Sequence, residues 1–289
     1  MDLKEYDSHR RTAHTASGDV SYVDVGTGRP ALFVHGVGTN AYLWRNVIGE
    51  LAGERRCIAL DLPLHGHSPI RPDQDLTLPG LAQVVEDLCA ELDLTGLDLV
   101  ANDTGGAVSQ VFAVHHKERL ATFTLTNCET HDNIPPKAFK PTVLLARTGL
   151  LALMGPRMVR DPAKARANVF GKGYQYPDRL SDEMLLAYLE PVLGTKERAR
   201  QFQRWVSSLH AKDLLAVEPE LRKLEVPTLV AWGTDDAFFE TRWAYWLRDT
   251  IPGVTEVVEI DGAHLFYPDE RAAELVPHLR RHWEKHPAH

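Results

Sequence analysis

The stretch Leu99-Val100-Ala101-Asn102-Asp103-Thr104-Gly105-Gly106 decides the fold of this chain. The apolar run Leu97 to Ala101 predicts a buried strand, and a helical pattern begins at about Thr104. Small residues flank the acidic side chain between them, as a strained strand-to-helix turn with close helix packing requires. This is the layout of a nucleophile elbow, a turn that lifts one side chain above the sheet. That side chain is Asp103, and a carboxylate suits attack on sp3 carbon because the resulting ester can be cleaved by water.

Asp103 also fits a second interpretation, a helix N-cap followed by a plain glycine turn. The rest of the chain favours the elbow, because buried strands and helices alternate on both sides of it with short turns. The expected strands cover residues 20–25, 31–34, 56–60, 97–101, 122–126, 228–232 and 254–260. This alternation predicts an α/β fold with a mostly parallel, doubly wound sheet.

The alternation stops between residues 129 and 218, where we find helical patterns, loops and prolines but no convincing buried strand. Helices are expected over Lys140–Leu153, Ser181–Leu189 and Lys196–Leu209. We interpret this region, 129–218, as a helical cap, or lid, inserted into a core domain made of residues 1–128 and 219–289.

The bulk composition narrows the class of protein. In 289 residues, 44% hydrophobic side chains suffice for a large core, and a net charge of −8 disfavours nucleic-acid or anionic-membrane partners. The cysteines Cys57, Cys89 and Cys128 lack metal-ligand spacing and are expected to be reduced thiols. The start of the chain is too polar for a signal peptide, and no apolar run is long enough for a bilayer. We therefore expect a soluble cytoplasmic protein, a monomer or homodimer, that binds a small apolar substrate and water.

Partners for Asp103 follow other predicted strands. His264 lies just past the last strand and is a candidate base, while Asp236, past the preceding strand, is the candidate acid that orients it. The backbone N–H groups of Val37 and Thr104 are candidates for an oxyanion hole. The order Asp103, Asp236, His264 is nucleophile, acid and histidine, as in α/β-hydrolases.

With these motifs, the chain resembles the α/β-hydrolase superfamily over nearly its whole length. Within it, the chain looks like the aspartate-nucleophile branch that contains haloalkane dehalogenases and epoxide hydrolases. The resemblance rests on His35-Gly36, Tyr42 to Asn46, Asp61 to Ser68, Asp103 to Gly106, His116 to Arg119 and Gly262-Ala263-His264. It implies a two-step hydrolysis through an alkyl ester on Asp103, with neither metal nor organic cofactor.

The chain departs from that branch where the leaving group is bound. Haloalkane dehalogenases usually carry Trp after the nucleophile and Asn after His-Gly, as halide donors, and here these positions are Thr104 and Val37. Trp205 is a candidate substitute. Epoxide hydrolases use cap tyrosines as donors to the epoxide oxygen, for which the cap candidates are Tyr174, Tyr176 and Tyr188. His35, Asn127 and Phe238 complete the candidate pocket residues.

The identity of the acid has an alternative. Some members of the superfamily place it after the sixth strand, and that slot is Asn127 here, followed by Glu129 two residues later. We favour Asp236 and keep Glu129 as the alternative acid.

Other activities also fit these residues. Asp103 as a general base would give an esterase or lactonase, and His264 as the base would give a cofactor-free oxygenase or isomerase of the same fold. A non-catalytic receptor that retains the pocket is a further alternative.

Overall fold

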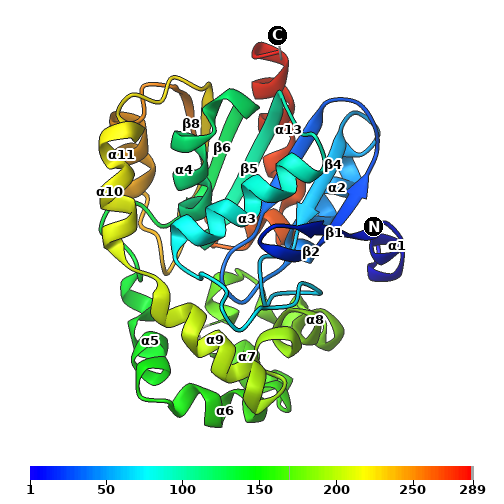
Figure 1. Ribbon diagram of the computed structural model, residues 1–289, viewed down its shortest axis with the longest axis vertical. Coiled ribbons are helices and arrows are strands. Elements are labelled where there is room, and N and C mark those ends of the chain that lie inside the picture. Colours follow the sequence, from blue (N-terminus) through cyan, green and yellow to red (C-terminus); the bar gives the residue numbers. More distant parts are fainter. Residues whose placement is uncertain (169, 288–289) are drawn as a thin grey trace.

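The fold is an eight-stranded sheet with helices on both faces. In a computed structural model, residues 1–168 and 170–287 are described (Figure 1). The strand order is β1-β2-β4-β3-β5-β6-β7-β8. β1 and β2 pair antiparallel to each other and β2 to β4, whereas all later pairs are parallel. The strands are β1 Arg10–Thr15, β2 Gly18–Val25, β3 Pro30–Val34, β4 Arg56–Leu60, β5 Leu97–Asp103, β6 Leu120–Cys128, β7 Thr228–Gly233 and β8 Val254–Ile260.

Two layers of helices cover the sheet. On one face α3 packs against α4 and α10, and on the other α2 packs against α13 (Figure 1). The helices outside the 129–210 region are α1 Leu3–Ser8, α2 Arg45–Leu51, α3 Leu78–Glu91, α4 Thr104–His115, α10 Ala211–Leu221, α11 Arg242–Thr250, α12 Tyr267–Glu270 and α13 Ala272–Lys285. Both faces of the central strands are thereby buried, and every residue of β5 is buried. The predicted α/β fold with a mostly parallel sheet is confirmed.

A group of five helices lies beyond the carboxyl ends of the parallel strands, at the bottom of Figure 1. They are α5 Lys140–Arg147, α6 Leu150–Val159, α7 Pro162–Ala167, α8 Asp182–Leu193 and α9 Lys196–Ser208. They pack mainly on one another, with α9 contacting α5, α6 and α8. Short 3-10 turns complete the chain at η1 Ala41–Trp44, η2 Lys117–Arg119, η3 Lys137–Phe139, η4 Gly171–Gly173 and η5 Pro177–Arg179.

Two details differ from the predicted helical region. The helix expected over Lys140–Leu153 is two helices, because Gly149 takes a left-handed φ of 81° that ends α5 and turns the chain into α6. The expected boundary at residue 218 falls inside α10, which packs on α3 and α4 of the sheet layers.

Membrane-spanning potential is limited in the described residues. There, none of the helices alone has the length and apolar character to cross a bilayer, and only α5 with its preceding turn and α6 satisfy the criterion as a pair, across a bend of 112°.

Candidate active site

Asp103 occupies a strained turn between β5 and α4. Its φ of 55° and ψ of −138° are uncommon for a side-chain-bearing residue, and its side chain is buried. The turn is close-packed, since a Cβ on Gly105 would lie 2.3 Å from the carbonyl oxygen of His35, and one on Gly106 would lie 2.3 Å from Cβ of Cys128. The small residues predicted for an elbow are therefore required by the packing around Asp103.

The loop after β3 passes beside the Asp103 carboxylate. A Cβ on Gly36 would lie 2.3 Å from Asp103 Oδ2, so only glycine fits there. The backbone N–H groups of Val37 and Thr104 face the carboxylate and lower its pKa. Burial raises that pKa well above its usual range, and the charges of Glu129 and Asp236 raise it further. These two N–H groups are the pair expected from the sequence for the oxyanion hole.

Two buried histidines hold this loop in position. His35 Nε2 accepts from the backbone N–H of Leu62 at 2.9 Å, and His65 Nε2 accepts from that of Gly38 at 3.2 Å. Burial lowers the pKa of His35 to about 4 and that of His65 to about 3. Both rings are therefore neutral at physiological pH, and each has an acceptor nitrogen for the loop. His35, an expected pocket residue, lies behind the loop.

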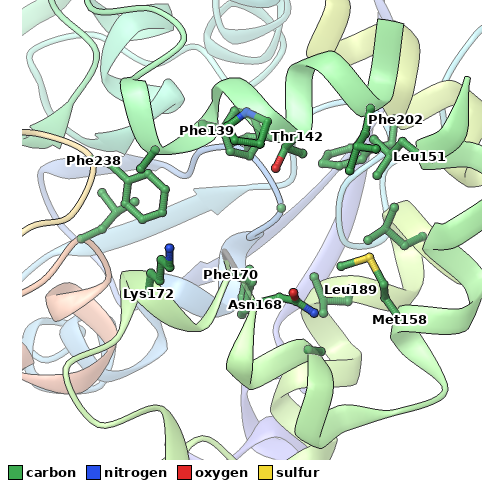
Figure 2. A pocket seen from close by; sticks show the side chains of 18 of the residues that line it. Phe139, Thr142, Leu151, Met158, Asn168, Phe170, Lys172, Leu189, Phe202 and Phe238 are labelled. Atoms are coloured by element: carbon green, nitrogen blue, oxygen red, sulfur yellow. The ribbon is translucent and has the colours of Figure 1, made fainter. Parts of the chain in front are cut away.

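A cavity of about 550 Å³ opens above Asp103, between the sheet and the helical group (Figure 2). Its size and apolar lining suit a small organic molecule. In Figure 2, Lys172 and Phe238 lie at one end, and Leu151 and Phe202 lie at the other. The lining includes the predicted residues Val37, Asp103 and Phe238, and also Phe139, Leu145, Met158, Phe170, Leu189, Leu265 and Phe266. The residues that the helical group contributes to this set gave no recognisable signal in the sequence, because helical periodicity does not distinguish a cavity wall from a core.

Glu129 lies in the cavity wall, next to the nucleophile candidate. Its side chain is 2% exposed. Oε1 accepts from the hydroxyl of Thr104 at 2.9 Å, while Oε2 is buried without a hydrogen-bond partner among the described residues. Burial raises the pKa of Glu129 to about 7. Glu129 was expected only as an alternative acid, and the structure places it directly in the cavity.

Asp236 is buried behind the cavity after β7. Its Oδ2 accepts from the Asn127 amide at 2.7 Å, and its Oδ1 accepts from the backbone N–H of Phe238 at 2.7 Å. Burial raises the pKa of Asp236 to about 7, although the nearby imidazole of His264 lowers it. Asn127, an expected pocket residue, is a partner of this carboxylate and is absent from the described lining of the cavity.

His264 has a different orientation from the one expected. Its Nδ1 lies 3.3 Å from the carbonyl oxygen of Lys172, and its Nε2 lies 3.6 Å from Asp235 Oδ2. In the part of the chain that the structure describes, no hydrogen bond joins His264 to Asp236, and the ring is not part of the cavity wall. Asp235 is 80% exposed, so its ion pair with His264 is a weak surface contact.

The three candidate tyrosines are placed away from the cavity. The hydroxyl groups of Tyr174 and Tyr188 donate to Asp269 Oδ2 at 3.0 and 3.1 Å, and Tyr176 is 44% exposed and lies against Arg179. Asp269 is buried, and a carboxylate without hydrogen-bond donors would be unfavourable there, which explains why both phenols donate to it. The expected donor role for these tyrosines has no support in this geometry.

Trp205, the expected halide donor, is also placed outside the cavity wall. Its ring is fully buried and packs edge-on against His65 at 4.9 Å between centroids. The indole therefore contributes to the packing of α9 against the loop after β4.

Comparisons with known proteins agree with this architecture. A model of the alpha/beta hydrolase fold family matches residues 30–271. A cis-3-alkyl-4-alkyloxetan-2-one decarboxylase of Xanthomonas campestris pv. campestris is 25% identical, over 93% of each chain. A haloalkane dehalogenase of Sphingobium indicum is 27% identical, over 91% of this chain and 92% of its own.

Solved structures share the same fold. An epoxide hydrolase without ligand aligns with a TM-score of 0.78 at 18% identity, over 96% of this chain and 98% of its own. A thermophilic esterase from Thermogutta terrifontis aligns with a TM-score of 0.73 at 24% identity, over the same shares. At these identities the similarity shows the fold alone, and the reaction depends on the residues of the site.

Proposed function

Because the chain belongs to the α/β-hydrolase family, we propose that it is a hydrolase in which Asp103 attacks an sp3 carbon of a small apolar substrate. The observation that carries the proposal is the position of Asp103: a carboxylate on a strained elbow, at the base of a mainly apolar cavity and beside two backbone N–H groups. An aspartate in this place forms an alkyl ester, and an apolar cavity raises its nucleophilicity by removing water.

An epoxide is the substrate class that this site supports best. A departing halide needs donors, and the two usual donor positions are Thr104, whose hydroxyl points to Glu129, and Val37, which has no side-chain donor. Trp205 does not compensate, because its indole lies outside the described cavity wall. An epoxide releases no halide, because its oxygen stays on the product and needs a proton, so the missing halide donors matter less.

The ester is then hydrolysed by water. His264, oriented by Asp236, takes a proton from the water, which attacks the carboxyl carbon of the Asp103 ester. The N–H groups of Val37 and Thr104 stabilise the oxyanion that forms there. This step requires the His264 ring to turn from the Lys172 carbonyl toward Asp236, which lies near it.

A strained lactone is a second candidate substrate. The relative from Xanthomonas campestris pv. campestris is named for an alkyl-substituted oxetan-2-one, a four-membered lactone, and its similarity covers 93% of this chain. Attack by Asp103 on the ring sp3 carbon would displace a carboxylate, which leaves without the proton that an epoxide oxygen needs.

The covalent intermediate provides the test. Replacing His264 with Gln removes the base for the second step only, so incubation with styrene oxide is expected to raise the intact mass by that of one substrate, on the peptide that contains Asp103. In heavy-oxygen water, a single turnover of the unmodified enzyme is expected to label the Asp103 carboxylate, because water attacks the ester carbonyl.

Asp103→Asn serves as the control, and it should form no adduct. If Asp103 is instead a general base, water attacks the substrate directly, the His264→Gln variant carries no adduct, and the label appears in the first product. That pair of results would overturn the proposal. Turnover of an oxetan-2-one with none of epoxides would favour the second candidate substrate.

A further inference from the structure

Opening an epoxide requires a proton donor, because the ring oxygen leaves as a poorly stabilised alkoxide. The phenols of Tyr174 and Tyr188 are both engaged with Asp269, and the hydroxyl of Thr104 donates to Glu129. Val37 offers only its backbone N–H, which faces the Asp103 carboxylate. These three hydroxyl groups are therefore engaged with other residues, and Trp205 lies outside the described cavity wall.

Glu129 has the geometry that these residues lack. It lines the cavity with Asp103, and its Oε2 is buried with no partner among the described residues, while Oε1 is held by the Thr104 hydroxyl. The backbone of Glu129 is fixed as well, because its carbonyl oxygen accepts from the Gln110 amide at 2.8 Å. One carboxyl oxygen is thus held in place, and the other has no partner among the described residues of the cavity wall.

A carboxylic acid explains this arrangement better than a carboxylate. An ionised oxygen without a partner in a buried site carries a large desolvation cost. Asp103 and Glu129 are buried neighbours whose charges oppose each other, so one proton between them is favoured. Asp103 Oδ2 is also buried without a partner among the described residues, but two backbone N–H groups and the N-terminus of α4 stabilise the Asp103 anion, which favours placing the shared proton on Glu129.

We propose that Glu129, held in place by Thr104 and Gln110 and kept neutral by its burial beside Asp103, is the catalytic proton donor that protonates the leaving oxygen when Asp103 attacks. This inference rests on the proposed function and assigns a residue to its first step. A bond forms between Asp103 and the substrate carbon, the carbon–oxygen bond breaks, and its electron pair takes the proton from Glu129 Oε2. Hydrolysis of the ester then yields the diol, the Asp103 carboxylate and one proton, which restores Glu129.

The test compares leaving groups. In the His264→Gln background, adduct formation is followed by intact mass with styrene oxide, whose oxygen needs a proton, and with a primary iodoalkane, whose iodide does not. Adding Glu129→Gln, which keeps the size of the side chain, is expected to slow the epoxide reaction by about a hundredfold or more and to change the iodoalkane reaction by less than about threefold. The control is Asp132→Asn, an exposed acid of the same loop, which should alter neither rate.

Each other outcome has a defined meaning. Equal slowing of both reactions would show that Glu129 only positions Asp103, and no slowing would show that it has no role, so either result overturns the inference while the covalent mechanism stands. Absence of any adduct before Glu129 is changed would instead refute the proposed function itself.

A second measurement needs no change at Glu129. In His264→Gln, adduct formation with the epoxide is expected to fall as the pH rises above about 7, while that with the iodoalkane does not fall. The groups that face Glu129 are Asp103 after β5, Thr104 and Gln110 of α4, and Asp236 after β7, with Lys172 on the cap side of the cavity. A parallel fall for both substrates would assign the titration to another of these groups and overturn the inference.

Discussion

At the scale of single residues, the site depends on Gly36, whose missing side chain leaves room for the nucleophile candidate. A Cβ there would lie 2.3 Å from Asp103 Oδ2, and Asp103 cannot retreat because its backbone is already strained. The close approach also keeps the next N–H, that of Val37, beside the carboxylate.

Gly36→Ala is therefore expected to lower the free energy of unfolding by about 1–3 kcal/mol, as overpacking does, and to abolish adduct formation at Asp103. Urea denaturation and intact mass measure the two effects. Gly53→Ala is the matched control, because a Cβ at Gly53 meets nothing within 4 Å. A Gly36→Ala protein as stable and as reactive as this control would show that Asp103 can move freely.

At the scale of elements, a buried ion pair joins the helical group to the core. Asp269 of α12 accepts from Tyr174 and from Tyr188 of α8, and lies 2.5 Å from the Arg45 guanidinium at the start of α2. Arg45 and both phenols offset the cost of burying this carboxylate, although burial still raises its pKa. The network links α8 to α2 and α12. It thereby fixes the helical group, which forms one wall of the cavity, over the sheet side that carries Asp103.

Tyr188→Phe is expected to lower the free energy of unfolding by about 1–2 kcal/mol, since Asp269 loses a partner, while adduct formation with styrene oxide changes less than about threefold. Hydrogen exchange in α8 should become faster. A hundredfold loss of the adduct rate without a change in stability would instead make Tyr188 a proton donor and contradict the structural role given to it.

At the scale of the whole molecule, acid stability depends on buried histidines. Burial lowers the pKa of His282, on α13, to about 4, and it also lowers the pKa values of His35 and His65. In the unfolded chain these histidines bind protons near pH 6.5, whereas in the folded protein they do so only near their lowered pKa values. The stability that they contribute is therefore intact above about pH 6.5 and declines as the pH falls toward 4. Glu129 and Asp236 act in the opposite direction, because the folded protein protonates them at about 7.

A variant isolates the histidine effect from these opposing carboxyls. The difference in stability between the wild type and His282→Gln is measured by urea midpoints. We expect it to decrease steadily as the pH is lowered from 6.5 to 4 and to remain constant above pH 6.5. His210→Gln is the control, because His210 is exposed and its side chain makes no hydrogen bond among the described residues, so the change should alter the urea midpoint little. A flat difference for His282→Gln would mean that this ring takes up its proton without unfolding.

The sequence by itself determined the fold and the places where chemistry-bearing residues gather. Strand periodicity and the small residues around Asp103 predicted the elbow, since both are local properties of the chain. Parallel strands end at one edge of the sheet, so Asp103, Asp236 and His264 could be assigned to a common region from their positions alone.

Only the tertiary structure decided which side chains meet. The pairing of Asp103 with Cys128 across β5 and β6 brings the next residue, Glu129, into the cavity, and that register is set by long-range strand packing. The phenols of Tyr174 and Tyr188 turn to Asp269 because its buried charge needs donors, and nothing in the cap sequence encodes the position of that partner. Local patterns specify elements and strand ends, whereas the direction of a polar side chain depends on which unpaired group the fold buries beside it.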